Sequence, residues 1–83
     1  MIYIVMFFSH FGAVRYKQQC SEQGITCRMM PVPRDLSSSC GTCVRCDGNY
    51  LPPAGASAEE IEQVAAWDGH SYTTVYHTDA AED

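Results

Sequence analysis

The chain has 83 residues, of which 46% are hydrophobic and 18% charged, a composition that excludes an intrinsically disordered protein and a length that allows one modest core. We expect a single domain over residues 1–83, ordered to about residue 78 and followed by an acidic tail at 79–83. Asp and Glu number 10 against 5 Lys and Arg, a net charge of -5, which argues against a nucleic-acid partner because phosphate backbones are bound through basic side chains.

The first predicted element is a strand at the N-terminus. The run from Ile2 to Phe8 is rich in β-branched and aromatic residues, which predicts a central strand buried on both faces. The run lacks the basic flank and cleavage site of a secretion signal and is too short to span a bilayer, so we expect a cytoplasmic protein without membrane contact. Ser9 as N-cap, residues at helical spacing and Gly24 as a stop then predict a helix of about three to four turns.

The middle of the chain predicts two strands joined by a loop. The segment 25–30 is short and extended, and it ends at Pro31-Val32-Pro33, where two prolines exclude a helix. The segment Gly41–Asp47 alternates weakly and predicts the next strand. The residues between these segments therefore form an exposed loop.

The last third of the chain predicts a helix and a final strand. The segment from Ser57 to Glu60 matches a capping box, and apolar residues at helical spacing follow it up to Gly69, so we expect the second helix there. Tyr72–His77 is β-branched and aromatic and predicts the last strand. The order βαββαβ predicts an α+β ferredoxin-like sandwich, with a four-stranded antiparallel sheet and two helices on one face. The open face and the sheet edges would allow a homodimer.

Groups that could carry chemistry gather on the loop from Arg34 to Cys46. The stretch from Pro31 to Gly41 combines a stiff Pro-x-Pro, a guanidinium, three serines and a cysteine followed by glycine. The thiolate is the nucleophilic form of cysteine, and a nearby guanidinium with backbone N–H groups of a glycine-containing turn would favour it. The predicted site consists of Cys40, Cys43 and Arg34 for the chemistry, and of Gly41, Ser39 and Ser38 for substrate contact.

The same loop carries a resemblance to a known family. The order of elements, the Pro31-Val32-Pro33-Arg34 and Ser37-Ser38-Ser39-Cys40-Gly41 segments and the segment from Ala58 to Val64 resemble the small selenium/sulfur carrier-like family, over most of the chain from Tyr3 to about Tyr76. The resemblance implies a ferredoxin-like fold. It also implies that Cys40 holds a sulfur or selenium atom, as a persulfide or perselenide, between a donor and an acceptor protein.

The sequence departs from the family pattern in the strand after Cys40-Gly41, which is usually apolar and here carries Cys43, Arg45 and Cys46. Cys43 either resolves a Cys40 persulfide, which releases sulfide and leaves a disulfide, or has no role. Cys40, Cys43 and Cys46 also match three ligands of a zinc or iron–sulfur site, although a strand would send Cys43 and Cys46 to opposite faces. The C-x-x-C form is shared with thioredoxin-like oxidoreductases, but no helix pattern follows Cys40.

We therefore expect a carrier or accessory protein without a tightly bound cofactor, rather than a stand-alone enzyme. The alternatives are a zinc or iron–sulfur protein, and a non-catalytic interaction or oligomerisation module whose loop cysteines are incidental. Cys20 and Cys27 lie on a helix stripe and in an apolar strand, where a buried and inert thiol is the usual outcome. Glu59, Glu60 and Glu62 are expected to meet solvent on the first turns of the second helix.

Overall fold

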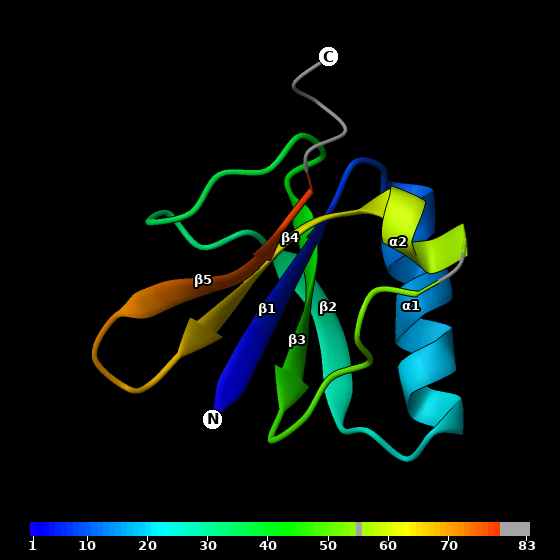
Figure 1. Cartoon of the computed structure of the whole chain (residues 1–83), viewed down its shortest axis with the longest axis horizontal. Coiled ribbons are helices and arrows are strands. Elements are labelled where there is room, and N and C mark those ends of the chain that lie inside the picture. The colour runs from blue at the N-terminus through cyan, green and yellow to red at the C-terminus, as the bar shows by residue number, and fades with distance from the viewer. Residues whose placement is uncertain (55, 79–83) are drawn as a thin grey trace.

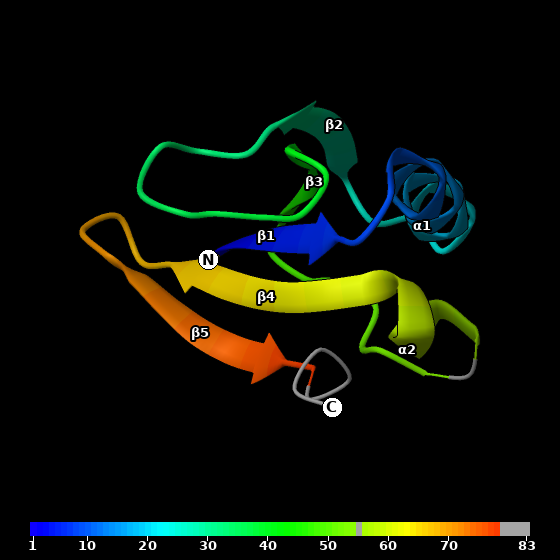
Figure 2. The same ribbon diagram turned by 90° about the horizontal axis from the view of Figure 1, so that it is seen from above.

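The computed structural model describes residues 1–54 and 56–78 and consists of a five-stranded antiparallel sheet with two helices on one face (Figure 1, Figure 2). The strands lie in the order β2-β3-β1-β4-β5. In chain order the elements are β1 (Ile2–Phe7), α1 (His10–Glu22), β2 (Cys27–Pro31), β3 (Thr42–Asp47), α2 (Ala56–Glu60), β4 (Ile61–Trp67) and β5 (Tyr72–His77).

β1 is the central strand that its apolar run predicts. It pairs with β3 along one edge and with β4 along the other. Val5 and Phe7 lie in the core cluster under the helices, and Ile4 and Met6 lie in a second cluster on the opposite face. Because side chains alternate along a strand, a sheet covered on both faces needs apolar residues at every position of its central strand.

α1 also forms as predicted. The Ser9 side chain accepts a hydrogen bond of 3.2 Å from the backbone N–H of Gly12 and so caps the helix. Ala13, Tyr16 and Cys20 form the buried stripe that packs on the sheet. After the helix, Gly24 adopts a φ of 77°, the left-handed conformation that glycine allows at helix ends.

The prediction of a second helix that continues to Gly69 is wrong beyond Glu60. α2 has 5 residues, and the chain continues directly into β4, which occupies the second edge of β1. The segment Tyr72–His77 forms a strand as predicted, but it is β5, paired with β4 at the edge of the sheet. The Ser57 side chain, on which the capping box depends, and the tail at 79–83 lie outside the described residues.

A β-bulge explains why a strand carries a helix-like apolar pattern. The register pairs Met6 with Gln63 and Phe7 with Ile61, which leaves Glu62 as an extra residue in β4. Ile61 and Val64 therefore both reach the cluster under the helices, although they are three residues apart. The same separation places two side chains on one stripe of a helix.

The sheet has five strands rather than the predicted four, so the ferredoxin-like sandwich is matched in part. β1 and β2, joined through α1 with β3 between them, form a split βαβ unit, and β4 lies on the other side of β1. The departures are the short α2 and the added β5. The face opposite the helices, predicted to be open, is partly covered by the loop between β2 and β3, from which Val32 and Leu36 pack on the second core cluster (Figure 2). Among the described residues, no helix has the length and apolar character needed to cross a membrane.

Candidate functional site

The loop between β2 and β3, residues 32–41, is closed at its base by the backbone. Val32 N–H donates to the Gly41 carbonyl over 3.0 Å, and a turn forms where Leu36 N–H donates to the Pro33 carbonyl over 3.0 Å. Gly41 has a φ of 74°, which side chains with a Cβ adopt at a cost, so glycine is needed where the chain enters β3. The loop therefore returns to the sheet along a defined path.

Glu62 holds the second half of this loop. Its Oε1 accepts from the Ser39 backbone N–H at 2.9 Å, and its Oε2 accepts from the Ser39 hydroxyl at 3.0 Å. The Ser38 hydroxyl lies 3.2 Å from Glu62 Oε1 and 3.1 Å from the Phe7 carbonyl. Beside this carboxylate, the Gln63 amide donates to the Ser37 carbonyl over 3.0 Å. We call this set of contacts the Glu62 clamp. It fixes the loop to the last residue of β1 and to the first residues of β4.

Sequence reasoning missed the clamp. Glu62 was expected to meet solvent on a helix, whereas it is the bulge residue of β4 and half-buried. Bulges commonly re-aim a side chain away from the ladder, and here the re-aimed carboxylate meets the serines. The hydroxyls of Ser38 and Ser39 are thus engaged within the protein, and their predicted contact with substrate would require the clamp to open.

Cys40 lies directly after the clamp and is half-buried, packed against the core cluster under the helices. Its thiol donates to the Thr42 carbonyl over 3.4 Å. The ring of His10, at the start of α1, lies 3.4 Å from the Thr42 hydroxyl. A thiolate has no proton to donate to a carbonyl, so the Cys40 side chain must leave the Thr42 oxygen before it reacts as a nucleophile.

The structure does not bring all of the predicted site residues together. Arg34 is exposed, and within the described part of the chain it makes no hydrogen bond or ion pair. Cys43 is fully buried in the cluster on the face opposite to that of Cys40, where its thiol donates to the Pro31 carbonyl over 3.7 Å. Burial, with a smaller contribution from nearby Cys40, raises the pKa of Cys43 to about 11. Cys43 therefore remains a thiol at neutral pH.

Cys46 lies on the other side of β3 from Cys43. It is fully buried in the cluster under the helices, and this burial raises its pKa. Cys43 and Cys46 thus point to opposite faces of the sheet, as alternation along a strand requires. Among the described residues, no group of three or more His, Cys, Asp or Glu side chains is placed to hold a metal ion.

A family model described as "Putative Se/S carrier protein-like" matches residues 2–76 of the chain. The chain belongs to this Se/S carrier protein-like family. The match covers the whole sheet up to the last positions of β5 and includes the complete loop that carries Cys40, and it confirms the resemblance seen in the sequence. No curated protein and no solved structure matches the chain.

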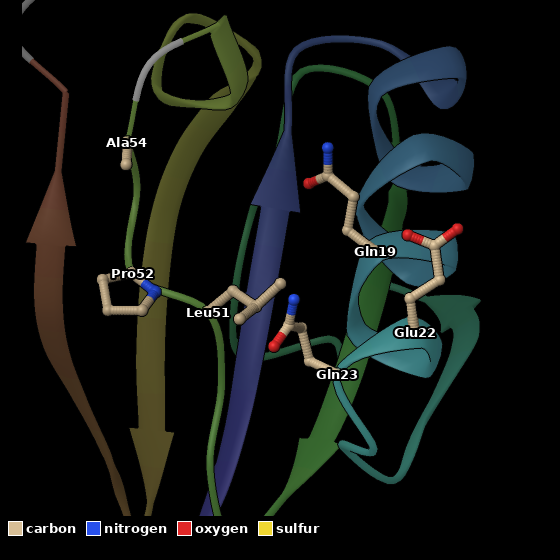
Figure 3. A pocket seen from close by; sticks show the side chains of 6 residues that line it. All are labelled: Gln19, Glu22, Gln23, Leu51, Pro52 and Ala54. Atoms are coloured by element: carbon tan, nitrogen blue, oxygen red, sulfur yellow. The ribbon is translucent and has the colours of Figure 1, made fainter.

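Two grooves of the protein lie away from the Cys40 loop. One, of about 380 Å³, runs between the end of α1 and the segment 51–54 (Figure 3), with Gln19 and Glu22 on one side and Leu51 and Pro52 on the other. The other, of about 390 Å³, lies at the opposite end of the sheet from the Glu62 clamp, between the N-terminus and the turn after β4. Neither of these two grooves is lined by a residue of the loop.

Proposed function

We propose that the protein carries a sulfur or selenium atom on Cys40, as a persulfide or perselenide, and passes it from a donor protein to an acceptor protein. The observation that supports this is the contrast among five free thiols. Cys20, Cys43 and Cys46 are fully buried, and burial raises the pKa of each. Of the two half-buried thiols, Cys27 and Cys40, it is Cys40 that lies on a loop.

The proposed transfer uses two thiol-exchange steps. The Cys40 thiolate attacks the terminal sulfur of a donor persulfide; a new S–S bond forms at Cys40, and the donor leaves as its thiolate. An acceptor thiolate then attacks the terminal sulfur on Cys40 and returns Cys40 to its thiolate. Each step conserves the electron count, so no external oxidant or reductant is needed. Arg34, exposed on the same loop, would turn toward the charged cargo and stabilise it.

A carrier must also keep its cargo from being discharged early. A thiolate that attacked the inner sulfur of a Cys40 persulfide would release sulfide and close a disulfide. The position of Cys43 on the opposite face, with its raised pKa, supports a carrier over a C-x-x-C oxidoreductase. We place the function in the cytoplasm, where thiols are kept reduced.

The proposal is tested by loading the reduced protein with sodium polysulfide and measuring its intact mass before and after a thiol reductant. The wild type should gain the mass of a sulfur atom that the reductant removes, and selenide with glutathione disulfide should give the selenium analogue. Cys40→Ala should lose the gain, whereas Cys27→Ala, which removes the other half-buried thiol, should keep it. Equal loading of Cys40→Ala would refute the proposal. Elemental analysis of protein purified without chelator tests the zinc or iron–sulfur alternative.

A further inference from the structure

Two cysteines face each other across the β2–β3 hairpin, Cys27 on β2 and Cys46 on β3. In the register of these strands Cys27 is the partner of Cys46. The Asp47 N–H donates to the Thr26 carbonyl over 2.9 Å, so Thr26 and Asp47 form a hydrogen-bonded pair and the adjacent Cys27–Cys46 pair is of the non-hydrogen-bonded kind. Opposite residues of that kind have Cα atoms about 4.5 Å apart, within the range of about 4.4–6.8 Å seen in disulfides.

Both side chains lie on the face covered by α1. Cys46 is fully buried in the cluster under the helices, and Cys27 is half-buried against that cluster, with its thiol donating to the Lys17 carbonyl over 3.7 Å. Cys20 of α1 belongs to the same cluster. Burial is the main cause of the raised pKa of Cys46, and the nearby Cys20 thiol is the second cause. Three thiols therefore meet beneath the helix, and of the three Cys27 is the one that reagents in solvent can reach.

We propose that Cys27 and Cys46 form an oxidisable cross-strand dithiol, a modification site separate from Cys40. A hydroperoxide first oxidises the accessible Cys27: the O–O bond breaks, an S–O bond forms and the hydroperoxide leaves as water or an alcohol. The Cys46 sulfur then attacks the Cys27 sulfenic acid, an S–S bond forms, and the hydroxyl leaves as water with the Cys46 proton. The two thiols together lose two electrons, which reduce the hydroperoxide.

The bridge would join the strands at the end of the hairpin away from the Cys40 loop (Figure 1). It would close a ring that contains that loop without using any residue of the Glu62 clamp. Cross-links of this kind restrict the unfolded chain, so the oxidised protein should unfold at a higher temperature than the reduced protein. The inference does not depend on the carrier function.

The test is oxidation of the reduced protein with equimolar hydrogen peroxide, alkylation of the remaining thiols and peptide mapping. Cleavage after Lys, Arg and Glu separates Cys20 from Cys27 at Glu22 and frees Cys46 after Arg45, whereas Cys40 and Cys43 stay in one peptide. We expect the peptide 23–28 linked to the peptide that begins at residue 46, with a loss of two hydrogen atoms from the intact mass.

Variants separate this outcome from others. Cys27→Ser should abolish the link, while Cys43→Ala, which alters a thiol buried on the opposite face, and Cys40→Ala, which should lose sulfur loading, should both retain it. A link between Cys20 and Cys46, a link within the Cys40–Cys43 peptide, or oxygen addition to Cys27 without a link would each overturn the inference.

Discussion

Replacing Glu62 by alanine tests whether one carboxylate holds the loop that carries Cys40. The change removes the acceptor for the Ser39 N–H and for the hydroxyls of Ser39 and Ser38. Hydrogen bonds to a charged group contribute about 1.5–3 kcal/mol each when buried. Here Ser39 is exposed to water and Ser38 keeps the Phe7 carbonyl, so we expect a total loss of about 1–3 kcal/mol.

The loss of these hydrogen bonds should first appear as faster opening of the loop. Hydrogen exchange of the Ser39 amide should speed up, because the clamp is its hydrogen-bond partner. Cys40, half-buried beside it, should react with iodoacetamide about five- to 140-fold faster if alkylation proceeds through the open loop, since about 1.4 kcal/mol corresponds to tenfold. Both rates are measured by mass spectrometry on the reduced protein.

The matched control is Glu59→Ala, which removes an exposed carboxylate from α2. This variant should leave the Ser39 exchange rate and the Cys40 alkylation rate at their wild-type values. Unchanged rates in Glu62→Ala, measured alongside this control, would refute the assignment of Glu62 as the residue that holds the loop.

Three further perturbations follow from the structure. The Tyr16 hydroxyl donates to the Leu51 carbonyl at 2.8 Å and accepts from its N–H at 2.9 Å, so Tyr16→Phe should lower the free energy of unfolding by about 1–3 kcal/mol in urea titrations; no change would mean that water replaces both bonds. Gly41→Ala places a Cβ at a φ of 74° and should cost about 1–2 kcal/mol in the same assay, and an unchanged stability would show that the turn relaxes. Burial raises the pKa of Cys43 from its ordinary 9.0 to about 11, so its contribution to stability is complete below pH ~9 and is lost as the pH rises toward ~11, a difference of about 2–3 kcal/mol. Cys43→Ala should accordingly lose less stability than the wild type between pH ~8 and pH ~11, and equal losses would contradict the shift.

Local patterns predicted the elements whose formation depends on local features. The apolar run of β1, the Ser9 cap and Gly24 stop of α1, and the two prolines at the end of β2 and just beyond it each act within a few residues, and the corresponding elements form where expected. The loop between β2 and β3, with Gly41 at its end, was also located from such signals.

The segment after Glu60 was misassigned because tertiary pairing outweighed its local pattern. The open edge of β1 requires a partner strand, and the segment from Ile61 supplies one with a bulge that a helical periodicity imitates. The clamp was beyond sequence reasoning for a related reason. It joins Ser39 to a carboxylate 23 residues along the chain, and that contact exists only once β4 lies beside β1.

The candidate site depends on this one irregularity of β4. In a regular strand Ile61 and Val64 would point to opposite faces, because side chains alternate with a period of two. The extra residue, Glu62, brings both side chains into the cluster under the helices. Because Glu62 is not matched across the ladder, its side chain is available to the loop serines. A single inserted residue thus completes the core and positions the Cys40 loop. A small chain therefore needs no additional helix or strand to hold this loop.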